Sequence, residues 1–268
     1  MGRFIVALVG AVTLSVTGAS AADTAVKAPA RQSPIEPSFS WTGWYGGVHG
    51  GYGWGPGDTS IGWVDPGAVG GVAAAVAAGV IPVGFSTDPD GALGGIQIGY
   101  NYQVNPNWVV GAETDFSFSS LKGEQTINTA VTPAFLPITN TVWQRLDWFG
   151  TIRARLGFAA NNWLFYATAG GAYGHLKYSY TQYNLAFGGA ATAAVNAIGS
   201  ESNLEWGWTA GGGIEYGWAR WTLRAEYLYL DLGDHSFGVP QNTVPTAIFT
   251  PNFENKYHIV RAALSYRF

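Results

Sequence analysis

Acidic and basic side chains are scarce in this chain, and several of them recur at every second position. Only 11% of the 268 residues are Asp, Glu, Lys or Arg. Glu113 alternates with Asp115, and Arg153 alternates with Arg155. Residues two apart in an extended strand point to the same side of a sheet, so these groups can meet in a network of ion pairs. The predicted members are Glu113, Asp115, Arg145, Asp147, Arg153, Arg155, Glu205, Glu215, Arg224, Glu226, Arg261 and Arg267.

Catalysis has one local candidate, the string that runs from Asp231 to Ser236. It places Asp234, His235 and Ser236 side by side, which supplies an acid, a base and a nucleophile. The same residue types are also the ordinary composition of a turn. The other histidines lack the i, i+4 spacing of a helical metal site; they are His49, His175 and His258. We therefore predict no catalytic, metal-binding or cofactor-binding residue, and no enzyme.

Composition excludes further classes of function. The chain has no cysteine, which removes disulfides and thiolate chemistry. A net charge of -4 without a basic stripe argues against nucleic-acid binding. A phosphate-binding glycine loop has to be followed by a helix. No helix pattern follows the glycines at 51, 53 and 55, so this kind of site is excluded. An average soluble domain is about a quarter charged, so the surface of this protein is unusually poor in charge.

The N-terminal segment has the features of an export signal. Arg3 precedes an apolar run over residues 4–16, and Ala19-Ser20-Ala21 supplies small residues before a cleavage site. Residues 1–21 are therefore predicted to be a signal peptide. Residues 22–40 hold three prolines and few apolar side chains, and are predicted to be a disordered periplasmic tail. The remaining domain covers residues 41–268.

The last stretch of the chain, residues 256–268, shows a reversed strand pattern. Phe268, Tyr266 and Leu264 share one face, whereas Arg267 and Arg261 lie on the other. A strand of a membrane barrel turns its apolar face to lipid and its polar face to the lumen. Segments from residue 44 onward repeat this pattern in about eight strands. Only the facing of residues 163–180 is left open.

The connections between these segments alternate in length. Those at 104–107, 159–162 and 219–220 are tight, whereas 55–91, 122–142, 181–203 and 231–255 are long. Short periplasmic turns and long outer loops distinguish outer-membrane barrels. Aromatic residues flank the tight turns and are predicted to form an interfacial belt: Trp44, Tyr102, Trp108, Phe158, Trp163, Trp218 and Trp221. The pattern predicts an all-β fold, an eight-stranded antiparallel up-and-down transmembrane β-barrel.

Residues 68–85 are the one competing segment. They are uncharged and nearly long enough for a membrane helix, but they are rich in Ala and Gly and contain Pro82. We expect an outer loop, part of which is helical. Exposed apolar residues in the loops, such as Phe135, Leu136, Ile248 and Phe249, would suit contacts with host or envelope proteins.

The predicted lumen admits two functions. An eight-stranded barrel is just wide enough to be filled by side chains, and buried charges must be paired. The acidic and basic residues would then plug the lumen, and the barrel would be structural. The alternative is a charged constriction in a narrow pore. Either barrel must pair the strand at 44–54 with the last strand, because closure removes both exposed edges.

Several strings in order resemble a known family. They are the segment after Ala19-Ser20-Ala21, with Lys27-Ala28-Pro29, and then 41–47, 166–171 and 224–229. Together they are similar to the small alphaproteobacterial outer-membrane immunogenic proteins, of the porin-like, OmpA-type superfamily that includes the opacity proteins. The resemblance implies a surface antigen of a Gram-negative outer membrane that supports envelope integrity.

The same resemblance implies partners and an assembly signal. Tyr266 and Phe268 look like the C-terminal aromatic signal that the barrel-assembly machinery reads. Outer-membrane lipid and lipopolysaccharide would surround the barrel. Some relatives are described as weak porins or haemin binders, so a diffusion channel and loop-mediated ligand binding of the haemin type stand as alternatives.

Overall fold

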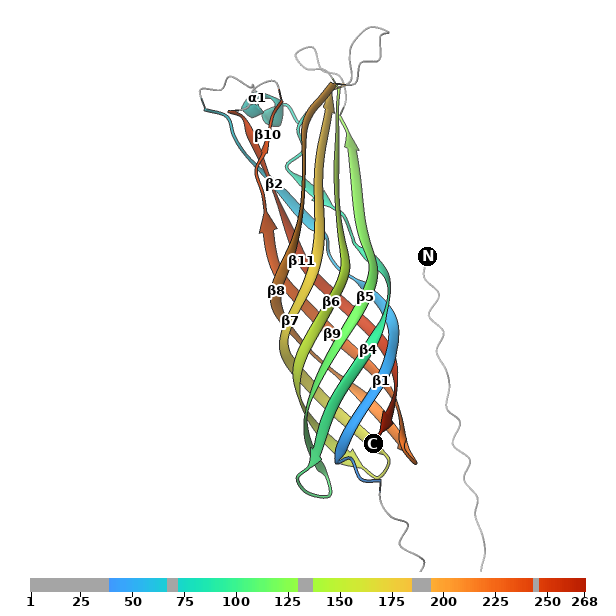
Figure 1. The fold of residues 1–268 in the computed structure, drawn as a ribbon. Coiled ribbons are helices and arrows are strands. Elements are labelled where there is room, and N and C mark those ends of the chain that lie inside the picture. The colour runs from blue at the N-terminus through green and yellow to red at the C-terminus, as the bar shows by residue number, and fades with distance from the viewer. Residues whose placement is uncertain (1–38, 67–71, 130–136, 185–193, 243–245) are drawn as a thin grey trace, which may run out of the picture. The chain divides into compact units, whose positions relative to one another are not determined.

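The computed structural model describes residues 39–66, 72–129, 137–184, 194–242 and 246–268. The predicted signal peptide and almost all of the predicted tail lie outside these residues. The chain divides into Met1–Pro37 and Ser38–Phe268, and the second unit contains the fold (Figure 1). Its elements are β1 (Gly43–Trp54), β2 (Asp58–Val64), α1 (Val72–Ala77), β3 (Gly84–Ser86), β4 (Asp90–Gln103), β5 (Trp108–Asn128), β6 (Ile138–Ala160), β7 (Trp163–Asn184), β8 (Ala194–Trp218), β9 (Trp221–Ser236), β10 (Val239–Pro240) and β11 (Ile248–Arg267).

Eight of these strands close into a ring. Antiparallel neighbours follow the order β1-β4-β5-β6-β7-β8-β9-β11, and β11 pairs back with β1. The closing pair runs from Tyr45 opposite Arg267 to Trp54 opposite His258. The predicted eight-stranded barrel and its closure by the first and last strands are confirmed. Closure leaves the ring without a free edge at this level.

The three tight turns lie at one end of the ring, which we call the turn end, and the opposite end is the loop end (Figure 1). Two of the turns contain a non-glycine residue with positive φ, Asn161 at 53° and Ala219 at 50°. This left-handed conformation lets the chain reverse within two residues.

The faces of the strands are inverted relative to a water-soluble barrel, as the sequence predicts. Ile152, Leu156 and Phe158 are exposed on the outside, whereas Arg153 and Arg155 are buried inside. Strand β7, whose facing the sequence left open, points Leu164, Tyr166 and Thr168 inward. Its outward residues begin with Trp163 and Phe165.

The strands extend far into the segments that we expected to be loops. β5 continues to Asn128, β6 begins at Ile138, and β7 continues to Asn184. β2 and β3 prolong β1 and β4 in the same way, because β2 pairs with β11 as β1 does. The predicted boundaries of the long loops are therefore wrong. Within the described part of 68–85 the structure has the six-residue helix α1 and the first two residues of β3, and none of the described helices is long and apolar enough to cross a membrane.

The interior of the loop end explains these long strands, because it is filled by an apolar core. β8 and β9 stop pairing at Trp208 and Asp231, and β4 and β5 stop at Asp90 and Lys122. Beyond these points β5–β8 face β2, β3, β9, β10 and β11 as two sheets. Side chains from both sheets pack between them: Leu121, Leu146, Phe149, Leu176, Tyr178, Tyr180, Phe237, Phe249, Phe253 and Tyr257. Burial of this apolar surface stabilises the sheets beyond the ring.

Residues 39–41 close the turn end. Trp41 is 1% exposed and packs with Val109, Ala159 and Leu164. Its backbone N donates to Gln103 Oε1 at 3.0 Å, and the ring of Phe39 meets the Trp41 ring edge-on at 4.7 Å between centroids. Phe39, which the sequence analysis places in the tail, thus packs against the barrel domain.

Candidate functional site

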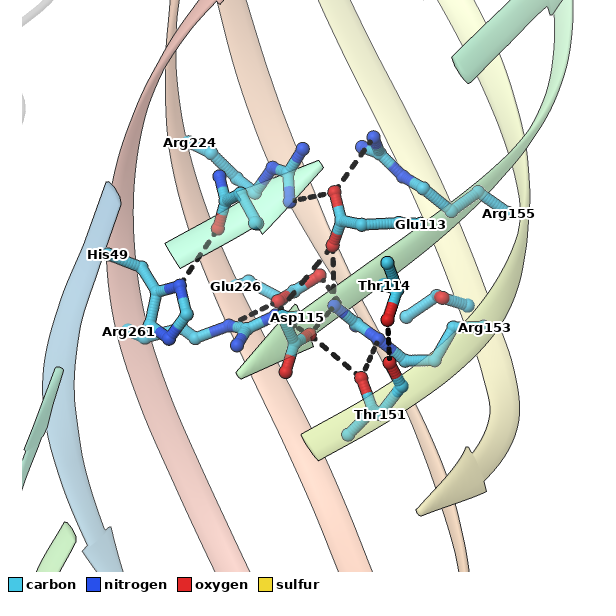
Figure 2. A network of polar contacts seen from close by, with 12 residues as sticks. His49, Glu113, Thr114, Asp115, Thr151, Arg153, Arg155, Arg224, Glu226 and Arg261 are labelled. Carbon is cyan, nitrogen blue, oxygen red and sulfur yellow. Dashed lines mark hydrogen bonds and ion pairs between the residues drawn. The ribbon is translucent and has the colours of Figure 1, made fainter. Parts of the chain in front are cut away.

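Four arginines and four carboxylates meet inside the ring. They project inward from five strands, β5, β6, β8, β9 and β11, and most of them are drawn in Figure 2. The eight residues are Glu113, Asp115, Arg153, Arg155, Glu215, Arg224, Glu226 and Arg261, which we call the lumen charge network. Their side chains are 0–3% exposed.

Glu113 is the centre of the network. Its Oε1 lies 2.5 Å from Arg153 Nη2, and its Oε2 lies 2.6 Å from Arg224 Nη1. Arg155 and Arg261 approach the same carboxylate at 3.6 and 3.8 Å. All four arginines therefore share this one acid. A carboxylate has about four acceptor sites, so Glu113 can accept from Arg153 and Arg224 and keep sites for other donors.

The other three carboxylates complete two branches of the network. Asp115 Oδ2 accepts from Arg153 at 2.8 Å and from Arg261 at 3.0 Å. Glu226 joins the same two arginines, at 3.0 Å from Arg153 and 2.6 Å from Arg261. Glu215 forms the second branch and accepts from Arg155 at 2.8 Å.

Two tyrosines, which the sequence analysis did not single out, also belong to the site. Tyr45 donates its hydroxyl to Glu113 Oε2 at 2.7 Å and accepts from Arg155 Nη1 at 2.7 Å. Tyr166 donates to Glu226 Oε1 at 2.7 Å, and its ring lies 4.0 Å from the guanidinium carbon of Arg155. Such stacking of a guanidinium on an aromatic face is attractive. The sequence held a signal for Tyr45: it follows the belt residue Trp44 directly, so it lies on the opposite face of the strand, which is the face toward the lumen.

A neutral group of side chains continues the polar interior beside β1. His49 lies 3.0 Å from Gln97 Oε1 and 2.8 Å from Ser117 Oγ, through its two ring nitrogens. Gln97 in turn donates to Ser265 Oγ at 2.9 Å. His49 is therefore satisfied by hydrogen bonds within the wall of the barrel.

The charges of the network balance, four against four. Moving a single ion out of water costs several kcal/mol in real proteins, so each buried charge needs a partner and further hydrogen bonds. Each of the eight charges has at least one oppositely charged partner, and the hydroxyls of Tyr45, Tyr166 and Thr151 add hydrogen bonds. Chemically, this arrangement holds charges in fixed pairs and fills the lumen.

Four residues predicted for the network lie elsewhere, and this part of the prediction is wrong. Arg145 and Asp147 pair with each other at 2.8 Å on the outside of β6, because an irregularity between Leu146 and Trp148 shifts the strand. Glu205 contacts His235 at the loop end. Arg267 lies at the turn end, where it donates to the Thr42 carbonyl at 2.8 Å and stacks over Phe39.

The residues of the predicted aromatic belt all have exposed side chains and lie at strand ends next to the turn end. Phe268 is exposed in the same region, and its backbone N donates to the Trp44 carbonyl at 3.0 Å. The proposed reading of Tyr266 and Phe268 by the assembly machinery stays a prediction.

His235 is surrounded by carboxylates rather than arranged as a triad with its neighbours in sequence. Its Nε2 lies 2.9 Å from Glu201 Oε2, and its Nδ1 lies 2.9 Å from Glu205 Oε1. Its ring stacks on Tyr178 at 4.8 Å. The carboxylate of Asp231 accepts from the Gly233 backbone N at 2.9 Å. Among the described residues, no cluster of His, Asp and Glu could hold a metal ion.

The chain is similar in sequence to known outer-membrane proteins. The 31 kDa outer-membrane immunogenic protein of Brucella melitensis is 34% identical over 270 residues, which cover 98% of this chain and 99% of that protein. The 22 kDa outer membrane protein of Rhizobium leguminosarum is 27% identical over 229 residues, or 82% of each chain. The structure of OprG from Pseudomonas aeruginosa covers 85% of this chain and 97% of its own, with 10% identity and a TM-score of 0.44.

The family model described as "Outer membrane protein beta-barrel domain" matches residues 4–268. This match spans the whole of the closed ring and both of its ends. The chain therefore belongs to the outer membrane protein β-barrel family.

Proposed function

We propose that this outer-membrane protein is a structural barrel that does not conduct solutes and that contributes to envelope integrity. The observation that carries the proposal is the lumen charge network, whose eight side chains are 0–3% exposed. A pore lined by charged rings needs charges that face water, whereas these charges face one another.

Two further layers support a closed lumen. Trp41 fills the turn end, which is the periplasmic end, and the apolar core fills the outer half. An ion crossing the barrel would have to pass a tryptophan, a set of paired charges and a core of aromatic and aliphatic side chains. An eight-stranded ring has little room for a path around these groups.

The second part of the proposed role is contact at the cell surface. The outer half carries the ends of β5, β6, β7 and β8 that lie furthest from the turn end (Figure 1). Of the apolar residues expected to be exposed there, Ile248 is exposed, but Phe249 is buried against Tyr180 at 5.8 Å between ring centroids. Phe135 and Leu136 lie outside the described residues. Surface contact therefore has fewer apolar side chains available than the sequence suggested.

Planar-bilayer recording tests the closed lumen. Refolded wild-type protein is expected to give no steady conductance steps, because no water-filled path crosses the barrel. Folding of the same preparation is verified by its faster gel migration before boiling than after. A sixteen-stranded porin, which leaves an aqueous channel, serves as the positive control in the same bilayers. Reproducible steps from the wild-type protein would favour the alternative, a narrow diffusion channel.

A catalytic role for His235 is tested separately. We expect the wild-type protein and His235→Ala to show the same absence of peptide and lipid hydrolysis, because the ring nitrogens of His235 are occupied by Glu201 and Glu205. Turnover that is measurable in the wild-type protein and lost in His235→Ala would contradict the non-enzymatic role.

A further inference from the structure

Strands β8 and β9 separate in the outer half of the barrel wall. Their backbones pair as far as Trp208 opposite Asp231, and the next backbone bridge above this level joins Ala197 to Gln241. Each strand stays paired on its other side, β8 with β7 and β9 with β11. Side chains therefore have to close the wall between these two points. We call the two facing stretches the seam: residues 198–207 and 232–240.

Apolar packing closes the upper part of the seam. Gly199 of β8 lies against two side chains from the other stretch, because a Cβ atom at Gly199 would be 2.6 Å from Val239 Cγ2 and 3.1 Å from Phe237 Cε2. Glycine permits this close approach, since it has no Cβ atom. The upper part of the seam is thus packed without a backbone ladder.

His235 of β9 closes the lower part of the seam through polar contacts. Its Nε2 lies 2.9 Å from Glu201 Oε2, and its Nδ1 lies 2.9 Å from Glu205 Oε1. Asn203, between these two glutamates on β8, places its Nδ2 3.0 Å from the same Nε2. Three polar side chains of β8 thus converge on one ring of β9. We call these four residues the clasp.

The charged groups around the clasp are mostly acidic. Four carboxylates lie along this part of the seam and on the strands beside it: Glu201 and Glu205 on β8, Asp234 on β9 and Glu254 on β11. Lys256 of β11 pairs with Glu254 at 2.9 Å. Among the residues that the structure describes, neither Lys nor Arg pairs with Glu201 or Glu205, so the cation available to both is His235.

Aromatic rings cover the rest of His235. The ring of Tyr178, on β7, stacks on it at 4.8 Å between centroids, and Phe237 lies at 6.2 Å. Phe253 of β11 is opposite His235 in the strand register. Burial raises the pKa of Tyr178 further above neutral, so its hydroxyl is uncharged. The side chain of Lys177, next to Tyr178, is 43% exposed on the outer surface.

Hydrogen-bond chemistry gives the clasp two states. A carboxylate oxygen only accepts, so both glutamates are hydrogen-bonded only when both ring nitrogens of His235 carry hydrogen. A neutral ring keeps one N–H, so in either tautomer one glutamate loses its donor. When that residue is Glu201, Nε2 can accept from Asn203 Nδ2 instead. Histidine changes its charge between about pH 5 and 8.

We propose that His235 is a proton-binding site that controls the seam. When His235 is protonated, it bonds both Glu201 and Glu205 and holds β9 against β8. When it loses the proton, it releases one carboxylate and leaves both without a cation, so the seam opens more often. The clasp therefore stabilises the seam at low pH, and this stabilisation is lost as the pH rises through the histidine range.

Opening of the seam uncovers part of the apolar core of the outer half. Tyr178, which is 0% exposed, lies directly behind the ring of His235. The lumen charge network lies lower in the barrel, since Glu215 is about ten residues further along β8 than Glu205. The seam can therefore open while the network stays intact, and the inference does not depend on whether the barrel conducts.

Hydrogen exchange followed by mass spectrometry tests the clasp on the refolded full chain at about pH 5.5 and about pH 8. Each exchange rate is divided by the intrinsic rate at the same pH to give a protection factor. Protection of the seam is expected to fall about two- to fivefold at the higher pH, which is the effect of a partly exposed ion pair.

The reference for this measurement is residues 139–146 of β6, which lie at the same height as the seam but pair with a strand on both sides. Their protection is expected to be the same at both pH values. This comparison within the wild-type protein requires no substitution. An equal change in the seam and the reference, or stronger protection of the seam at the higher pH, would overturn the proposal.

Two substitutions of His235 separate its charge from its packing. His235→Gln cannot gain a proton, so its seam is expected to show at both pH values the low protection that the wild-type protein has at the higher pH. His235→Arg is charged at both pH values and is expected to keep the high protection. Gel migration before and after boiling verifies that both variants fold.

His175→Gln is the matched control. His175 also contacts a carboxylate, that of Asp147 at 3.4 Å, but it lies where β7 and β8 are paired continuously. This variant is expected to keep the pH response of the wild-type seam. A pH response retained by His235→Gln, a wild-type response in His235→Arg, or a response lost in His175→Gln would each contradict the assignment of the clasp to His235.

Discussion

Replacing Glu113 with glutamine is expected to lower the free energy of unfolding by about 3–5 kcal/mol, the usual cost of removing one partner from a buried ion pair. The substitution keeps the size of the side chain but leaves four buried arginines with three carboxylates. It also replaces one carboxylate oxygen, which accepts from Arg153 or Arg224, with an amide nitrogen that can only donate. Because all four arginines approach Glu113, the loss cannot be confined to one pair.

The measurement is urea unfolding of the protein in lipid vesicles, followed by tryptophan fluorescence. Glu124→Gln is the matched control on the same strand, since Glu124 is 46% exposed and pairs with one exposed lysine. Such surface pairs contribute at most about 1 kcal/mol. The double variant Glu113→Gln/Arg224→Met restores the balance of charge and should recover part of the stability. Equal stability of Glu113→Gln and Glu124→Gln would show that the network does not hold the barrel together.

The second large effect is expected at the periplasmic end, where Trp41→Ala should cost about 3–5 kcal/mol of stability. Trp41 is 1% exposed and packs with Val109, Ala159, Leu164 and Tyr166. Its removal leaves a cavity directly below the lumen charge network. Tyr166 would then lose packing on one side while its hydroxyl still donates to Glu226.

Unfolding in urea measures this loss as well, and the control is Trp63→Ala. Trp63 is 36% exposed on β2 at the outer end, so its truncation should leave the midpoint nearly unchanged. A Trp41→Phe variant retains most of the apolar surface and should lie between the two. If Trp41→Ala unfolds at the same urea concentration as the wild-type protein, residues 39–41 do not close the barrel.

The sequence contained enough to predict the barrel, because its strands have to present opposite polarity to lipid and lumen. In β11, Leu264 and Val260 point outward while Arg261 and Ser265 point inward, as alternation predicts. The outer half was harder to foresee. The inward face of the same strand continues as Ile259, Tyr257 and Phe253, which are apolar. A rule that makes the lumen face polar therefore fails there, and the alternation does not identify these segments as strands.

The site was predictable only where the alternation is unbroken. Arg153 and Arg155 lie below the irregularity in β6, and their facing follows from simple counting. Arg145 lies above the irregularity, where Leu146 points inward. Counting every second residue from Arg153 therefore predicts the wrong face for Arg145. Nothing in the residue types around Leu146 reveals this shift, because it is set by pairing with β5 and β7. The prediction for Glu205 failed for another reason. Glu205 lies about ten residues further along β8 than Glu215, so it is too far from the other charges to join their network.

The long outer half also affects how the protein can change over evolutionary time. Trp148 lies about ten residues from Phe158 at the turn end, and β6 continues about ten residues further to Ile138, which is roughly 25 Å along the barrel for a tilted strand. The described ends of β5, β6 and β7 thus extend far beyond the closed ring, around an apolar core in which Tyr180 packs against Phe249.

Lengthening a tip costs only the slowly growing entropy of closing a longer loop. Such an insertion reaches neither the paired charges of the lumen nor the lipid-facing belt. The core of the outer half therefore separates two regions that differ in the substitutions they can accommodate. Residues around Glu113 can change only in compensating sets, whereas the tips are free to diverge one residue at a time.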